Sequence, residues 1–138
     1  DSESCWIPPE KWDACKGPFP DLKGKPVHVA VDAGFLQDIC AVSAVFPVDG
    51  KFYVRSWGIA PRKAADERER QNLTSYLRFA QDGSLVLVPG DCVSIEDDLY
   101  PLLDRLIKEH DVQSITVDPW QLRQLEQHYM KRGLTVYE

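Results

Sequence analysis

Two apolar runs in this 138-residue chain each end in an aspartate, and they constrain the fold more than any other feature. Residues 27–32 read VHVAVD and residues 114–118 read SITVD. Short runs rich in β-branched residues are typical of the buried parallel strands of α/β sheets. In such sheets, ligands bind at the carboxyl ends of the central strands. The sequence therefore predicts an α/β fold with Asp32 and Asp118 at one edge of its sheet.

The segments between these two runs predict a mixed sheet. Residues 39–46 and 51–57 form two further strand-like runs, and Asp49-Gly50 between them is a hairpin signal. The remaining patterns predict a helix over 62–81, a strand over 85–88, a helix after Ser94, a helix from Pro119 and a strand over 134–137. A three-strand meander followed by β-α-β units is the topology of a ribonuclease-H-like fold, a mixed sheet flanked by helices.

Helical spacing also predicts which side chains are buried. Pro101 interrupts the helix after Ser94, so we expect that helix to be kinked or to start late. Pro119 suits the first position of its helix, and Gly133 suits its end. The expected buried faces are Leu73, Tyr76, Leu77 and Ala80 in the first helix, and Leu122, Leu125, Tyr129 and Met130 in the last.

Charge and cysteine content narrow the classes of protein. The net charge is −6, and residues 91–118 carry eight acidic residues against Arg105 and Lys108, which accounts for all of it. Such a chain binds nucleic acid poorly unless metal ions or other basic regions help. No run is long and apolar enough to span a membrane. The four cysteines lack zinc-finger spacing and indicate reduced thiols in a cytosolic protein.

Residues 1–26 differ in character from the rest of the chain. They are rich in proline and glycine and contain Trp6, Trp12 and Phe19, which predicts a linker or arm before a domain over 27–138. The arm could dock another domain or strap over this domain's own core. The chain opens without an initiator methionine or a leader, so we expect it to be part of a longer protein.

The aspartates at the strand ends have a chemical and a structural interpretation. Two carboxylates that meet at one edge repel one another unless a cation lies between them, and their hard oxygen atoms suit Mg²⁺ or Mn²⁺. Alternatively, each caps a helix start, and Asp118 before Pro119 is well placed to do so. Asp38 follows Asp32 by six residues and could be a third metal ligand, a supporting group for a metal site or a turn residue, of which we favour the last two.

Basic residues gather in one segment, where we consider two roles. Arg62, Lys63, Arg68 and Arg70 alternate with acidic residues, which is typical of a solvated helix face. Contacts to a DNA phosphate backbone are the alternative. No phosphate-binding loop and no serine-hydrolase motif is present, and His28, His110 and His128 lack ligand spacing.

Three segments together resemble the nuclease domain of phage terminase large subunits. These are VHVAVDAGFLQDICAVSAVFP at 27–47, QDGSLVLVPGDCVSIEDDLYPLLDRLI at 81–107 and SITVDPWQLRQLEQHYMKRGLTVYE at 114–138. The match covers roughly residues 27–138 in the order of the family. Through this resemblance, Asp32 corresponds to the first catalytic acid, Asp118 to the second, and Asp38 to the second aspartate of the opening motif.

The resemblance implies a metal-dependent DNA endonuclease that cuts concatemeric viral DNA during packaging, by two-metal phosphodiester hydrolysis with Mg²⁺ or Mn²⁺. It also implies double-stranded DNA, a packaging ATPase domain, a small terminase subunit and a portal as partners in the host cytoplasm. The family's third acid lies on a helix beyond the fifth core strand. We therefore expect that this chain is truncated before that helix and has little activity alone. The alternatives are another ribonuclease-H-like nuclease, such as a resolvase or transposase, and a non-catalytic assembly module.

Overall fold

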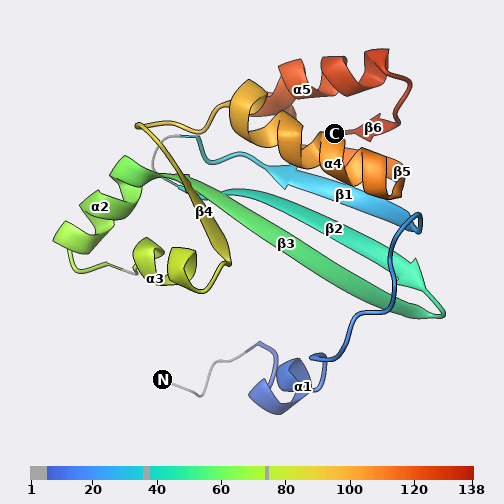
Figure 1. Ribbon diagram of the computed structural model, residues 1–138, viewed down its shortest axis with the longest axis horizontal. Helices are drawn as coiled ribbons and strands as arrows, with labels where there is room; N and C mark the ends of the chain where they lie inside the picture. The colour runs from blue at the N-terminus through green and yellow to red at the C-terminus, as the bar shows by residue number, and fades with distance from the viewer. Residues whose placement is uncertain (1–5, 36–37, 74) are drawn as a thin grey trace.

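A single mixed sheet organises the domain (Figure 1). The computed structural model describes residues 6–35, 38–73 and 75–138, with the backbone alone at 119–122. The six strands lie in the order β4-β3-β2-β1-β5-β6. They are β1 (Pro26–Asp32), β2 (Cys40–Val48), β3 (Lys51–Pro61), β4 (Leu85–Val88), β5 (Asp111–Val117) and β6 (Val136–Tyr137). The first three strands are antiparallel, whereas β4, β5 and β6 each pair in parallel with a neighbour.

Helices join and cover these strands. They are α1 (Pro9–Asp13), α2 (Arg62–Arg70), α3 (Tyr76–Gln81), the π-helical turn η2 (Ile95–Leu99), α4 (Tyr100–Glu109) and α5 (Pro119–Lys131). This is the flanked mixed sheet that the sequence predicts. In the described part of the chain, no helix combines the length and the apolar character that crossing a membrane requires.

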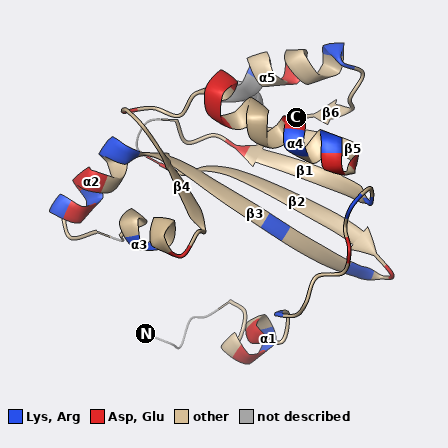
Figure 2. Cartoon of the chain, viewed as in Figure 1, with Lys and Arg blue, Asp and Glu red and all other residues tan. Residues whose placement is uncertain are grey.

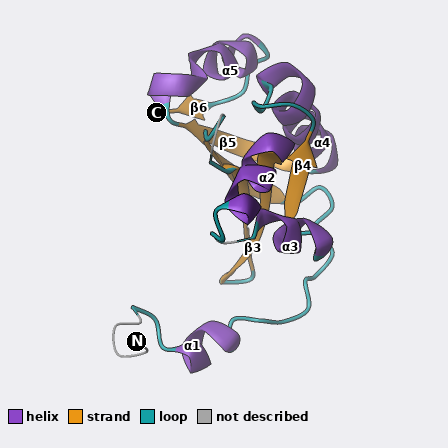
Figure 3. Cartoon of the chain, turned by 90° about the vertical axis from the view of Figure 1, so that its left-hand side faces the viewer, coloured by secondary structure: helices purple, strands orange, loops and turns teal. Residues whose placement is uncertain are grey.

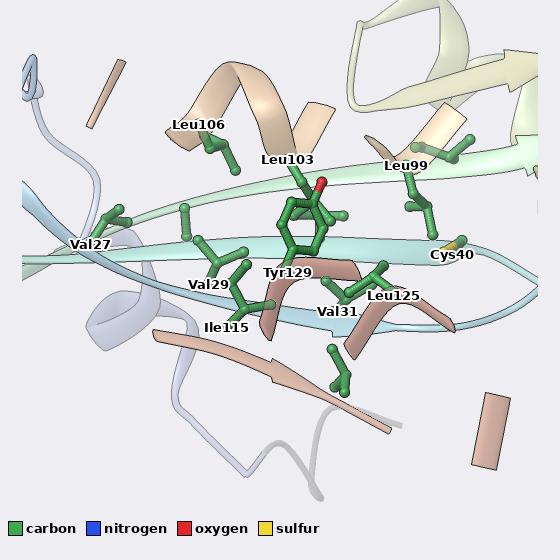
Figure 4. Packing of buried hydrophobic residues seen from close by; sticks show 14 of the residues in the cluster. Val27, Val29, Val31, Cys40, Leu99, Leu103, Leu106, Ile115, Leu125 and Tyr129 are labelled. Carbon is green, nitrogen blue, oxygen red and sulfur yellow. The ribbon is translucent and has the colours of Figure 1, made fainter. Parts of the chain in front are cut away.

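The main core lies between one face of the sheet and helices α4 and α5 (Figure 4). Alternate residues of β1 point into it, and Val27, Val29 and Val31 are almost fully buried. Leu103 from α4 and Tyr129 from α5 meet these valines. Because strand side chains alternate between the two faces, His28, Ala30 and Asp32 of β1 lie on the opposite, more exposed face.

A smaller core lies on that opposite face, at the end of β3. Ile59 belongs to the main core, so the next residue, Ala60, points to the other side, where it packs with Ala65 of α2, Tyr76 of α3 and Leu85 of β4. The segment between β3 and β4 thus forms a small second layer, which Figure 3 shows from the side.

The helix expected over 62–81 is wrong in one respect, because the segment forms two helices. The chain leaves α2 after Arg70, and Asn72 takes a left-handed conformation with φ of 54°, which an uninterrupted helix does not allow. Ser75 then caps α3, its hydroxyl accepting a hydrogen bond from the Arg78 N–H at 3.2 Å. As a consequence Leu73 is 48% exposed rather than buried.

Other local expectations are confirmed, with small changes. The hairpin turn is confined to Asp49 and Gly50, both left-handed, so β2 and β3 run further than the hydrophobic pattern indicates. Pro101 stands in the first turn of α4, and η2 precedes it, so the helix does start late. In α5, Leu125 and Tyr129 are fully buried as expected, but Met130 is exposed. The side chain of Leu122 lies outside those described.

Residues 19–25 hold the amino-terminal arm against the domain. Leu22 is buried in the main core, and its carbonyl accepts a hydrogen bond from Nδ1 of His110 at 2.8 Å. Phe19 packs against Tyr53 of β3. By contrast α1 buries no residue, and Figures 1 and 3 both show it apart from the other helices.

Candidate active site

The candidate site lies at the edge of the sheet where β1 and β5 end. Val31 pairs with Val117 in the parallel ladder, and Asp32 and Asp118 are the next residues of the two strands. Both aspartates are exposed. Figure 2 shows acidic residues at this end of β1 and at the turn before α4. Neighbouring strands lie about 4.8 Å apart, so the fold places Asp32 and Asp118, which are distant in the sequence, at adjacent strand ends.

The loop that follows Asp32 is tightly folded. A Cβ atom on Gly34 would lie 2.6 Å from the backbone oxygen of Ile39, so only glycine fits there without a shift. The Phe35 carbonyl accepts a hydrogen bond of 2.8 Å from the Val93 N–H, which ties this loop to the chain before η2. Gly34 and Phe35, at the start of the connection between β1 and β2, are therefore held both by Ile39 at its end and by Val93 from outside it.

Asp38 stands at the far end of this loop and faces the α2–α3 layer. Its Oδ1 accepts a hydrogen bond from the Ile39 N–H at 2.8 Å and another from the Tyr76 hydroxyl at 3.4 Å. Burial raises the pKa of Tyr76, the nearby Arg68 lowers it, and the Asp38 carboxylate raises it further. Asp38 thus bonds to the backbone of its own turn, as the sequence allows, and it also contacts the buried Tyr76.

Cys40 is the first residue of β2, and its side chain is buried in the main core. Burial is the main cause that raises the pKa of its thiol; the Gly34 N–H, which donates to the sulfur, lowers it, and the carboxylates of Asp32 and Asp98 raise it. Asp98 of η2 therefore lies at the same edge of the sheet. Its Oδ2 accepts a 2.7 Å hydrogen bond from the Ser94 N–H, which closes a capping box.

The sequence does not single out Asp98, because Asp97, three residues after Ser94, occupies the usual capping-box position. The structure divides the two roles: the Asp97 N–H donates to the Ser94 hydroxyl at 3.1 Å, while the return bond comes from the Asp98 side chain. A π-helical turn, which adds a residue to each turn, accounts for this displacement by one position. No sequence signal distinguishes the two acids.

The basic residues of α2 already have partners within the domain. Arg62 pairs with Asp66 at 3.2 Å, and Lys63 with Asp91 at 3.9 Å. Arg70 donates to the Asp66 carbonyl, and the Arg68 guanidinium lies over the Tyr76 ring, 4.5 Å from its centroid. The ion pairs of Arg62 and Lys63 are solvent-exposed and worth little energy, so both cations could exchange partners.

The donor set at this edge suits a divalent cation of the magnesium type. Asp32 and Asp118 offer exposed carboxylate oxygens, the ligands that Mg²⁺ and Mn²⁺ prefer, and Mg²⁺ usually keeps several water ligands beside one or two carboxylates. Among the side chains that the structure describes, no three histidine, cysteine or acidic residues gather as a metal cluster.

The three-strand meander and the parallel β1–β5 pair, flanked by helices, make up a fold of the ribonuclease-H-like class. The family model for the endonuclease domain of the terminase large subunit matches residues 1–137. This chain therefore belongs to the terminase large subunit endonuclease family.

A structural comparison bears on the fold. The crystal structure of the HK97 bacteriophage large terminase matches with a TM-score of 0.76 and 22% sequence identity. The match covers 96% of this chain and 28% of that chain, so the present chain spans little more than a quarter of that protein's length. At this identity the likeness shows the fold. No curated protein matches the sequence.

Proposed function

We propose that this chain is the part of a viral DNA-packaging terminase that cleaves DNA, an endodeoxyribonuclease that depends on Mg²⁺ or Mn²⁺. The observation that supports this most is the placement of Asp32 and Asp118 after paired residues of adjacent parallel strands, in a chain of the terminase endonuclease family. Its substrate would be double-stranded, concatemeric viral DNA in the host cytoplasm.

The two aspartates are the proposed catalytic residues. Asp32 and Asp118 would hold the metal, and both are exposed, so a phosphodiester can reach them. A pair of such ions, held by these two aspartates, would supply activation of a water and stabilisation of the leaving oxygen of the phosphodiester. Asp38 would support the site from the loop after β1, because its Oδ1 is already held by hydrogen bonds.

Bound cations would also reduce the repulsion between DNA and a chain with a net charge of −6. Asp32, Asp98 and Asp118 all lie at or near the proposed site and repel a phosphate backbone. Divalent cations there would make the local charge positive.

We further propose that Arg62, Lys63, Arg68 and Arg70 of α2 contact DNA. Ala41 of β2 pairs with Asp32 of β1 on one side and with Gly58 of β3 on the other. Because β3 ends three residues after Gly58, helix α2 begins at the same edge of the sheet as Asp32.

The wider assembly follows from the family. We propose that residues 1–26 connect the domain over 27–138 to a packaging ATPase, and that the small terminase subunit and the portal are further partners. The family match favours a terminase over a resolvase or transposase. A non-catalytic module has no specific observation in its favour.

Plasmid cleavage in Mn²⁺ tests the proposal. We expect weak nicking by the chain, because two aspartates supply only part of the ligand shell of an ion. Asp32→Ala should abolish it. Asp111→Asn is a matched control, because Asp111 is an exposed aspartate at the opposite end of β5; this variant should nick like the unaltered chain. Equal nicking by Asp32→Ala and the unaltered chain would contradict the proposed site.

A further inference from the structure

Tyr76 is a buried tyrosine whose hydroxyl points out of its own core toward Asp38. Only 4% of the residue is exposed, and its ring packs with Ala60, Ala65 and Leu85. Its hydroxyl donates to Oδ1 of Asp38, 38 residues earlier in the chain. This bond links α3 to the loop that begins at Asp32.

Hydrophobic packing also joins helices α2 and α3 to the residue after Asp38. Ile39, the residue after Asp38, packs against the cluster around Tyr76. Gly58 of β3 makes room for this contact: a Cβ there would lie 3.1 Å from a methyl group of Ile39 and 2.8 Å from one of Leu85. The segment between β3 and β4 therefore packs against Ile39 and also donates a hydrogen bond to Asp38.

In the described part of the chain, both hydrogen bonds to the Asp38 carboxylate go to the same oxygen atom. The Ile39 N–H and the Tyr76 hydroxyl both donate to Oδ1. Among the described residues, Oδ2 has no protein donor, and Asp38 is exposed. A carboxylate held by one oxygen has a defined direction, and its other oxygen can meet a cation or a water bound to one.

We propose that Tyr76 is a positioning residue for Asp38, and that the α2–α3 layer thereby sets the affinity of the Asp32 edge for divalent metal. The inference rests on the proposed function, because it assumes that the metal binds at Asp32 and Asp118. It assigns a role to the segment between β3 and β4 beyond covering the sheet. Arg68, whose guanidinium lies over the Tyr76 ring, helps to hold that ring in place.

Calorimetric titration with Mn²⁺ tests this role. Tyr76→Phe removes only the hydroxyl and should weaken Mn²⁺ binding about tenfold, the lower end for groups that orient metal ligands. Asp38→Asn should weaken it as well, and the double variant should be no worse than Asp38→Asn alone, since the two residues act as a unit. Tyr53→Phe is the matched control, because Tyr53 is a half-buried tyrosine on β3; it should bind Mn²⁺ normally.

Amide hydrogen exchange in the metal-free protein gives a second readout. If Tyr76 holds Asp38, Tyr76→Phe should speed exchange at the Ile39 N–H, which bonds to the same carboxylate oxygen, while Tyr53→Phe leaves it unchanged. Unchanged exchange at Ile39 together with unchanged Mn²⁺ affinity in Tyr76→Phe would overturn the inference.

Asp32→Asn distinguishes a failure of the positioning role from a failure of the proposed metal site. If this variant loses Mn²⁺ binding while Tyr76→Phe and Asp38→Asn retain it, the proposed metal site stands and the positioning role is refuted. If Asp32→Asn binds Mn²⁺ as well as the unaltered chain, the proposed function itself is refuted, and the positioning role falls with it.

Discussion

Val31 of β1 pairs with Val117 of β5, and an aspartate follows each of them. Because the two strands run parallel, Asp32 and Asp118 leave the sheet at the same edge. Two carboxylates at neighbouring strand ends repel one another, and a cation between them removes that cost. This single register gives the domain its candidate active site, and several measurable properties depend on the structure around it.

Gly34 should be intolerant of any side chain. Replacing it with alanine places a Cβ 2.6 Å from the backbone oxygen of Ile39, and a backbone group cannot move aside as a flexible side chain can. We expect Gly34→Ala to lower the free energy of unfolding by about 1–3 kcal/mol in urea denaturation. Gly17→Ala is the control, since no atom lies within 4 Å of its added Cβ, and it should change little.

Tyr129 should make the domain sensitive to alkaline pH. Burial, and then the adjacent Asp104, raise the pKa of its phenol far above the ordinary value of 10.0. Above about pH 10 the unfolded chain loses this proton while the folded chain keeps it, so the free energy of unfolding falls as the pH rises, by up to about 1.4 kcal/mol per pH unit.

Denaturation of the unaltered chain and of Tyr129→Phe between pH 8 and 11 measures this effect. The variant lacks the titrating group, so its free energy of unfolding should fall less steeply with pH above pH 10. Some pH dependence should persist, because the pKa values of Tyr76 and Tyr100 are also raised. The same slope in both proteins would show that Tyr129 does not carry the effect.

The cysteines should differ sharply in reactivity. Cys40 is fully buried, and burial together with Asp32 and Asp98 raises the pKa of its thiol, whereas Cys15 and Cys92 are exposed. Only the thiolate reacts, so alkylation of the native protein at pH 8 should modify Cys15 and Cys92 well before Cys40. Peptide mass spectrometry locates the labels, and early labelling of Cys40 would show that the loop after Asp32 opens readily.

The sequence predicts the parts of this site that depend on repeating patterns. Apolar strands ending in Asp32 and Asp118, and the order of elements around them, indicate both the fold class and the edge of the sheet where these two residues lie. Leu125 and Tyr129 follow from helical spacing in the same way. In each case one periodicity decides which face is buried.

Features that depend on tertiary contact could not be predicted in this way. Nothing in the hydrophobic pattern shows that the chain leaves the helix near Asn72, although Ser75 in hindsight marks a helix start. The bond from Tyr76 to Asp38 joins residues 38 positions apart, and only the packing of α3 on the sheet creates it. The place of Asp98 depends on a π-helical turn, which has no clear sequence signature.

Metal binding by Asp32 and Asp118 is the central claim, and Mn²⁺ titration followed by thermal unfolding tests it most directly. Mn²⁺ at ten times its dissociation constant should stabilise the unaltered chain and Asp111→Asn by about 1.4 kcal/mol. Asp32→Asn and Asp118→Asn should fold but lose this gain. Equal stabilisation of all four proteins, or of none, would contradict a metal site at the ends of β1 and β5.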